Sequence, residues 1–240
     1  PNEFLNLYGD NEDFIAQDHK DWTVIADRTY IYDYTINFLY TAQFFSNFET
    51  MQSTMKYMHD IGITGYIYNC GDGHYAAFNE LRNYLLCKLQ WDVDCDVEYH
   101  MNDFLKAFYG EEAAPYIKDY IDLQTAQTKG TAHAFDFDWH YQSGYYPVHT
   151  MAKLDCLWNK ALKADITQEQ FANVEIASLS WRFFKANQMQ GEYFFLNPAR
   201  LQEQEWLYDK YAELGHERGL TASRAMYEVL DDFVGQLLDK

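Results

Sequence analysis

The order of apolar patterns between residues 29 and 92 constrains the fold of this chain more than any other feature. Residues 29–38, "TYIYDYTINF", alternate like a β-strand, and residues 63–73, "ITGYIYNCGDG", resemble a second strand that ends in a glycine-rich turn. A helical pattern follows each strand, at residues 46–62 and 75–92. This spacing predicts a parallel βαβα unit, because parallel strands need a long crossover between them.

Two strands alone do not make a stable parallel sheet, which needs several strands and cover on both faces. Residues 18–92 are therefore interpreted as one end of a larger α/β sheet or barrel, whose other strands lie upstream or in another chain. The pattern turns helical after Trp91. The other predicted helices lie at residues 12–28, 96–110, 112–127, around 171–184, 199–214 and after Thr221, while residues 130–150 are predicted to be irregular.

Composition indicates a globular chain with a sizeable core, because 48% of the 240 residues are hydrophobic. The formal net charge of -19 repels phosphate backbones, so nucleic acid and anionic membranes are poor partners. Aromatic residues make up 18% of the chain. They would suit a neutral sugar that stacks on rings, although surplus rings are more often part of the core.

The four cysteines form no CxxC pair, which argues against a zinc site or a dense disulfide framework. They are Cys70, Cys87, Cys95 and Cys156, and the helical pattern around Cys87 predicts that it is buried. No apolar run approaches the ~20 residues of a membrane span. The first residues lack the pattern of a signal peptide, and the chain starts with Pro1, so we expect either a removed segment or a piece of a longer protein.

A metal site is the weaker interpretation of "AFDFDWHYQ". The alternating positions of Asp136, Asp138 and His140 could place all three on one side of an extended segment. The stretch lacks the glycine and the bidentate Glu of a calcium-binding loop. We therefore predict no metal and no cofactor.

Ligands in parallel α/β folds bind at the carboxyl ends of the strands. The predicted substrate-binding residues are therefore the polar groups near the two strand ends: Asp33, Tyr34 and Asn37 for the first, and Asn69, Asp72 and His74 for the second. An acid between two tyrosines can hold sugar hydroxyls while a ring stacks on the sugar. The alternative is that Asp33 caps a turn or pairs with a cation such as Arg28.

Glu80 is a further acid near this edge, in the first turn of the helix after the second strand. The helix dipole stabilises a carboxylate there, which favours a structural role. Glycoside hydrolysis uses two carboxylates about 5 to 9.5 Å apart, or one acid with substrate assistance. Asp33, Asp72 and Glu80 are candidates, but spacing along the sequence does not give their separation.

Several motifs together resemble a bacterial domain-of-unknown-function family, number 4838. They are "W-x5-R-x-YIYDYTINF", "NFETMQSTMKYMHDIGITGYIYNCG" and "ELRNYLLCKLQWDVDCDVEYHMNDFLKAFYG-x4-PYIKDYIDL", from about Trp22 to Leu123. The family is similar to glycoside hydrolase family 20 barrels and family 67 glucuronidases. Part of it is classified as glycoside hydrolase family 163, which acts on the N-acetylglucosamine core of N-glycans.

The resemblance implies a (β/α)8 barrel followed by a helical domain. On that map residues 1–92 are the last part of the barrel, with its last two strands, and residues 93–240 are the helical domain. The main catalytic acids would lie upstream of Pro1, in the remainder of the same polypeptide, and the protein would be extracellular or periplasmic. The rival interpretation is a non-catalytic carbohydrate-binding or helical scaffold module.

Two departures from the family pattern bear on the site. Relatives often carry Glu-Gln where this chain has Asn69 and Cys70, which weakens any prediction of an acid there. The family's Trp is Tyr32 here, and both rings can stack.

Overall fold

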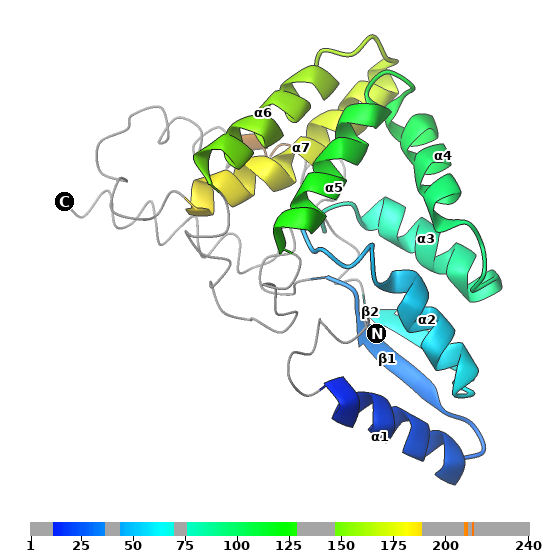
Figure 1. Cartoon of the computed structure of the whole chain (residues 1–240). Coiled ribbons are helices and arrows are strands. Elements are labelled where there is room, and N and C mark those ends of the chain that lie inside the picture. Colours follow the sequence, from blue (N-terminus) through cyan, green and yellow to red (C-terminus); the bar gives the residue numbers. More distant parts are fainter. Residues whose placement is uncertain are drawn as a thin grey trace.

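The computed structural model describes residues 12–36, 44–69, 76–128 and 147–188, together with residues 209, 210 and 213 (Figure 1). Its elements are α1 (Glu12–Ile25), β1 (Tyr30–Tyr34), α2 (Met51–Asp60), β2 (Gly65–Asn69), α3 (Asn79–Trp91), α4 (Val97–Tyr109), α5 (Ala114–Thr128), α6 (Val148–Ala161) and α7 (Gln168–Gln188). In these ranges the chain is thus mostly helical, with a small parallel sheet near its start.

The parallel pairing that the sequence predicts is confirmed. Strands β1 and β2 pair in parallel, with Ile31 opposite Tyr66 and Tyr34 opposite Asn69. A further bond from the Thr64 amide to the Thr29 carbonyl, at 2.8 Å, continues the pairing just before the strands. Helix α2 supplies the crossover that a parallel pair needs.

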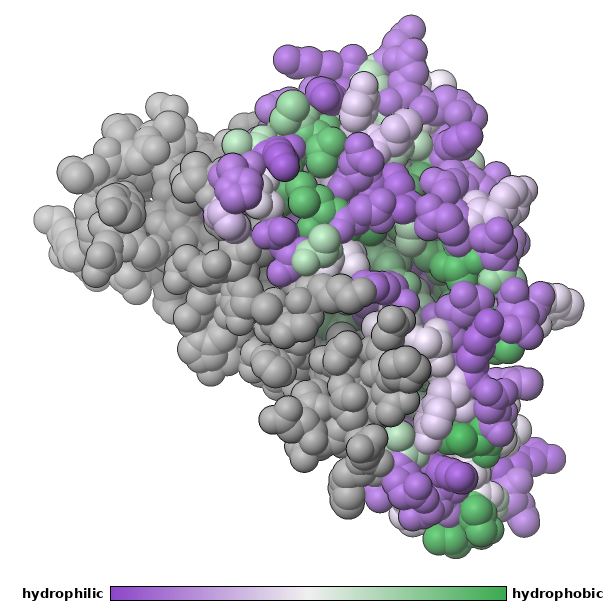
Figure 2. Space-filling model, viewed as in Figure 1, coloured by the Kyte–Doolittle hydropathy of each residue, from purple (hydrophilic) through white to green (hydrophobic). Residues whose placement is uncertain are grey.

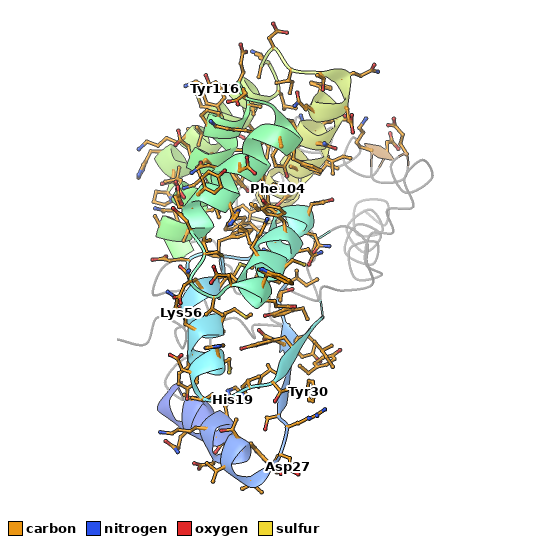
Figure 3. All side chains as sticks on the ribbon, turned by 90° about the vertical axis from the view of Figure 1, so that its right-hand side faces the viewer. His19, Asp27, Tyr30, Lys56, Phe104 and Tyr116 are labelled. Atoms are coloured by element: carbon orange, nitrogen blue, oxygen red, sulfur yellow. The ribbon has the colours of Figure 1, made fainter. Side chains whose placement is uncertain are left out.

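Helices α1 and α2 cover the same face of this sheet. The Tyr57 hydroxyl of α2 donates to the Ala16 carbonyl of α1 at 2.6 Å, and the Tyr68 hydroxyl of β2 donates to the Met55 sulfur of α2 at 2.6 Å. Ile31 packs into the small apolar cluster between these elements. Figure 3 shows both helices on one side of the sheet and Tyr30 on the other. A doubly wound sheet would instead carry helices on both faces.

One large hydrophobic cluster holds the helical part together, and it runs from Phe44 to Phe184. The apolar stripe that predicted α3 is confirmed, because Leu81, Leu85 and Leu89 are fully buried. The cluster crosses the predicted boundary near residue 92, and that domain boundary stays a prediction. Figure 2 shows hydrophilic side chains over much of the helical surface, with smaller hydrophobic areas between them.

Helix α6 is a difference from the prediction, which had no helix between residues 130–150 and the segment around 171–184. Its apolar stripe is Met151, Leu154, Trp158 and Ala161, at the i, i+3, i+7 and i+10 positions of a helix, and all but the partly buried Met151 are buried. The aromatic and histidine-rich stretch before Pro147 concealed this signal. Residues 129–146 and most of the two predicted C-terminal helices lie outside the described residues.

The prediction that Cys87 is buried is wrong, because its side chain is exposed. The buried stripe of α3 passes through Leu85, Leu86 and Leu89, and Cys87 lies between these positions on the other side of the helix. Within the described ranges, none of the helices is both long and apolar enough to cross a membrane.

Candidate functional site

The face of the sheet that α1 and α2 leave open is aromatic. Tyr30, Tyr32 and Tyr34 alternate along β1 and are 56%, 55% and 44% exposed, and Ile67 of β2 lies beside them at 54%. The rings of Tyr32 and Tyr34 meet edge to face, with centroids 5.4 Å apart. Large exposed rings on adjacent positions form a surface that a flat apolar face of a ligand, or another part of a protein, can cover.

Gly65 shapes the start of this face. A Cβ atom at Gly65 would lie only 3.0 Å from two ring carbons of Tyr30. The Tyr30 ring therefore lies close against the backbone of the neighbouring strand, a position that a larger residue at 65 would disturb.

Asp33 lies on the other face of the sheet, the one that α2 covers. Its carboxylate is half-buried and accepts a hydrogen bond from the backbone amide of Tyr34 at 2.8 Å. No ion pair joins Asp33 to a Lys, Arg or His among the described residues, and Arg28 is therefore not its partner there. Burial raises the pKa of Asp33 above its ordinary value, and the bond from the Tyr34 amide opposes this only in part.

Tyr66 shares this covered face with Asp33. Its ring stacks on Tyr68, with centroids 5.6 Å apart. Its hydroxyl is buried and finds no hydrogen-bond partner in the described part of the chain. Burial, and then the negative charge of Asp33, raise the pKa of Tyr66. The Asp33 carboxylate and the Tyr66 hydroxyl are thus two polar groups that are partly shielded from solvent on the face that α2 covers.

The structure separates Asp33 from Tyr34 and brings the backbones of Tyr34 and Asn69 together. Asp33 and Tyr34 point to opposite faces, so they do not line one surface. Tyr34 is the register partner of Asn69, and the two backbones therefore meet at the carboxyl end of the pair. Asn37, Asp72 and His74 lie outside the described residues. Their role in binding stays a prediction, as does that of Asp33.

Glu80 is exposed in the first turn of α3, where the helix dipole favours a carboxylate. Burial raises the pKa of the Tyr109 hydroxyl, and the negative charge of Glu80 adds a smaller increase. This placement fits the structural interpretation of Glu80.

Arg82 is the residue that the sequence analysis missed. It is 0% exposed, and its guanidinium donates to three acceptors near the carboxyl edge of the sheet. The acceptors are Asn47 Oδ1 at 3.1 Å, the Phe45 carbonyl at 3.1 Å and the Ala77 carbonyl at 2.9 Å. Its position in the buried stripe of α3, next to Leu81 and four residues before Leu86, was the available signal.

The backbone that enters α3 is strained beside Arg82. Phe78 adopts the left-handed conformation, with φ 56° and ψ 34°, although residues other than glycine rarely do so. Its buried ring contacts Phe44, Tyr109 and Trp158, with centroids 5.9, 6.4 and 6.3 Å apart. Such conformations persist when the surroundings hold them, and they gather at functional sites.

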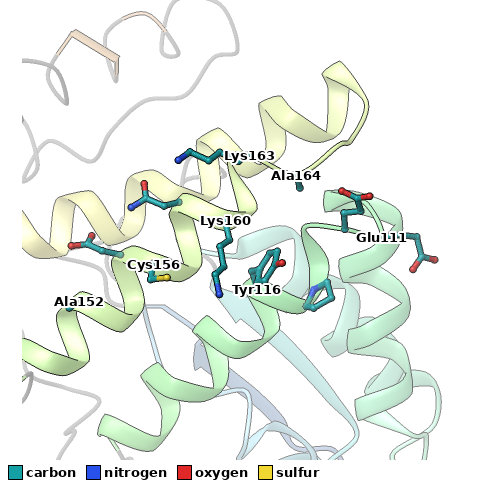
Figure 4. Close-up of a pocket in the computed structure, with 11 residues that line it drawn as sticks. Glu111, Tyr116, Ala152, Cys156, Lys160, Lys163 and Ala164 are labelled. Carbon is teal, nitrogen blue, oxygen red and sulfur yellow. The ribbon is translucent and has the colours of Figure 1, made fainter.

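A wide groove of 890 Å³ lies elsewhere, along α5 and α6 (Figure 4). Lys160 reaches across it toward Tyr116, with 5.4 Å between the ammonium nitrogen and the ring centre. All three carboxylates that line the groove have structural partners. Glu111 pairs with Lys106, and Glu112 accepts from the Asp165 amide. Asp155 accepts from Lys185 and from the Trp181 indole. Of the predicted site residues that the structure describes, none lines this groove.

Within the described ranges, no group of three or more His, Cys, Asp or Glu side chains could hold a metal ion. Asp136, Asp138 and His140 lie outside those ranges.

The geometry defines an α/β protein with helices on one face of a parallel strand pair, an aromatic surface on the other, and a helical continuation. Residues 6–122 match the family model described as Domain of unknown function (DUF4838). The match confirms the family resemblance that the motifs predict. No curated protein and no solved structure matches the chain.

Proposed function

We propose that this chain is part of a carbohydrate-active glycoside hydrolase that acts on glycans containing N-acetylglucosamine. On this proposal β1 and β2 are the last two strands of a (β/α)8 barrel. The other strands and the main catalytic acids would come from the same polypeptide upstream of Pro1.

The observation that carries the proposal is the open aromatic face of the sheet. In a closed barrel the helices lie outside and the other face of each strand points inward. Here α1 and α2 cover one face, while Tyr30, Tyr32 and Tyr34 lie exposed on the other. The tyrosines would then face the barrel interior, with Tyr34 nearest the end where barrel enzymes bind substrate.

The chemistry of that end supports a sugar as the ligand. Tyr34 offers a ring for stacking and a hydroxyl for hydrogen bonding, and it meets Asn69 across the strand pair. Interleaved rings and uncharged polar groups suit a neutral, hydroxyl-rich molecule. The net charge of -19 is compatible with such a ligand and unfavourable for a polyanion.

The test uses the longest natural polypeptide that contains this chain, with an N-glycan as substrate and mass spectrometry of the released sugars. We expect hydrolysis by that polypeptide and none by residues 1–240 alone, because two strands cannot close a barrel of roughly 250 residues. Tyr34→Ala should lower kcat/KM about ten-fold, the scale of one lost stacking contact of ~1.4 kcal/mol.

Tyr99→Ala is the matched control, because Tyr99 is also an exposed tyrosine but lies on α4. It should leave kcat/KM unchanged. Glycan binding without hydrolysis would instead indicate the non-catalytic carbohydrate-binding module. Neither binding nor hydrolysis by the long polypeptide would contradict the proposal and favour the helical scaffold.

A further inference from the structure

We propose that Arg82 is a positioning residue, which fixes the backbone at the carboxyl edge of the sheet so that ligand-contacting groups there keep one geometry. The inference rests on the proposed function for what that edge binds. The inference goes beyond the proposed function because it assigns the geometry of that edge to the buried Arg82 guanidinium on α3.

The contacts of Arg82 reach both chain segments that meet at this edge. Nη2 and Nε hold residues 44–47, which follow β1, through the Phe45 carbonyl and the Asn47 side chain. Nη1 holds residues 76–78, which follow β2, through the Ala77 carbonyl. A single planar fork thus ties together two segments about 30 residues apart in sequence, as guanidinium geometry allows.

Asn47 extends this link to the end of β1. Its side-chain nitrogen donates to the Thr35 carbonyl at 3.2 Å, and its side-chain oxygen accepts from Arg82. Thr35 directly follows Tyr34 in the chain. The relay therefore runs from the guanidinium, through one amide, to the residue next to the exposed tyrosine.

Stability alone is a poor reason to bury an arginine here. Apolar replacements of buried charged groups are often as stable, because removing a charge from water is costly. What the buried Arg82 guanidinium can supply instead is a fixed arrangement of the backbone groups that it binds. The left-handed Phe78 directly follows Ala77, whose carbonyl Arg82 holds, and such a conformation persists only where its surroundings fix it. The Phe48 ring, 4.9 Å from the guanidinium carbon, packs against Arg82.

The test compares amide hydrogen exchange in four variants of the 240-residue chain. Arg82→Met removes every donor and keeps an unbranched apolar stem, and Arg82→Lys keeps the charge without the fork. Asn47→Ala removes the bond to the Thr35 carbonyl and the acceptor of Arg82 Nε, and leaves the bonds from Arg82 to the Phe45 and Ala77 carbonyls. Leu85→Ala is the control for general destabilisation, because Leu85 is equally buried on α3 and makes no polar contact with either segment.

We expect Arg82→Met to speed exchange at least about ten-fold in residues 44–47 and 76–79, relative to α5 and α6. Arg82→Lys should give a smaller increase at the same places. Asn47→Ala should affect residues 35–36 and 44–47 but not 76–79. Leu85→Ala should raise exchange by a similar factor throughout the helices, since it lowers overall stability.

A uniform increase in Arg82→Met, like that of the Leu85 control, would overturn the proposal, and so would no increase. If Arg82→Met does not fold, Asn47→Ala decides by the same comparison. In the longer polypeptide, Arg82→Met should also weaken binding of N,N′-diacetylchitobiose about ten-fold. A wild-type protein that does not bind this sugar contradicts the proposed function alone, because the exchange pattern decides the role of Arg82 separately.

Discussion

Asp33 and Tyr66 lie on the same covered face of the sheet, and neither has an ion pair or a side-chain hydrogen-bond partner among the described residues. The charge of Asp33 adds to the burial that raises the pKa of Tyr66, and the Tyr66 hydroxyl has no hydrogen-bond partner in the described part of the chain. No ion pair to Asp33 occurs there either. The two groups therefore make this face less stable than an apolar one of the same shape.

Asp33→Asn should raise the free energy of unfolding at neutral pH by about 1 kcal/mol, because it removes a poorly solvated charge. Since burial raises the pKa of Asp33, the folded chain binds more protons than the unfolded chain between the ordinary and the raised pKa. Stability should therefore be full below about pH 3.9 and fall as the pH rises through that window. Asp33→Asn should lose this dependence, which urea denaturation at several pH values measures.

The control for Asp33→Asn is Asp27→Asn, because Asp27 is an exposed acid just before β1. It should change stability by less than about 0.5 kcal/mol at any pH. A marked drop in the stability of Asp33→Asn at neutral pH would instead show that the carboxylate has a stabilising partner.

Tyr66→Phe should leave stability unchanged or raise it by about 0.5–1 kcal/mol, because the lost hydroxyl is buried and has no hydrogen-bond partner among the described residues. Tyr57→Phe is the matched case. It loses a 2.6 Å bond to the Ala16 carbonyl and should cost about 1 kcal/mol. Thermal denaturation of both variants compares them, and equal losses would mean that Tyr66 has a partner after all.

Gly110→Ala should destabilise the chain more than Gly62→Ala. Both glycines have positive φ, of 94° and 88°. A Cβ at Gly110 would lie 2.5 Å from a side-chain carbon of Ile166, whereas one at Gly62 would meet nothing within 4 Å. We expect about 1 kcal/mol for Gly62→Ala, from backbone strain alone, and about 3 kcal/mol for Gly110→Ala. Similar midpoints in urea for the two variants would contradict this.

Asp96→Ala should cost about 1 kcal/mol, because Asp96 caps α4 by accepting from the Tyr99 amide at 2.9 Å. Asp94→Ala, two residues earlier, removes only an exposed ion pair with Lys56 and should cost less. High salt should shrink the Asp94 effect further and leave most of the Asp96 effect. Melting curves at two salt concentrations distinguish the two.

The sequence predicted the parallel strand pair. It also predicted which residues of β1 share a face, because side chains alternate between the two faces along its five residues. It did not predict which face the helices cover, since both faces carry tyrosines. The buried stripe of α3 could have indicated that Arg82 is buried, but not which groups it binds, because two of its acceptors, on Phe45 and Asn47, lie more than 30 residues away in the chain. The barrel, the sugar and the role of Asp33 stay predictions.

Exposed and partly buried side chains alternate strictly along β1, so the face that each residue occupies depends on the number of residues before it. Each residue from Tyr30 to Tyr34 can change type and keep its face. Loss or gain of one residue between Thr29 and Tyr32, however, would rotate the strand by one step and carry the tyrosines under α2. Homologues should therefore keep the number of residues between Thr29 and Tyr34 constant, so that positions 30, 32 and 34 stay on the face opposite α2.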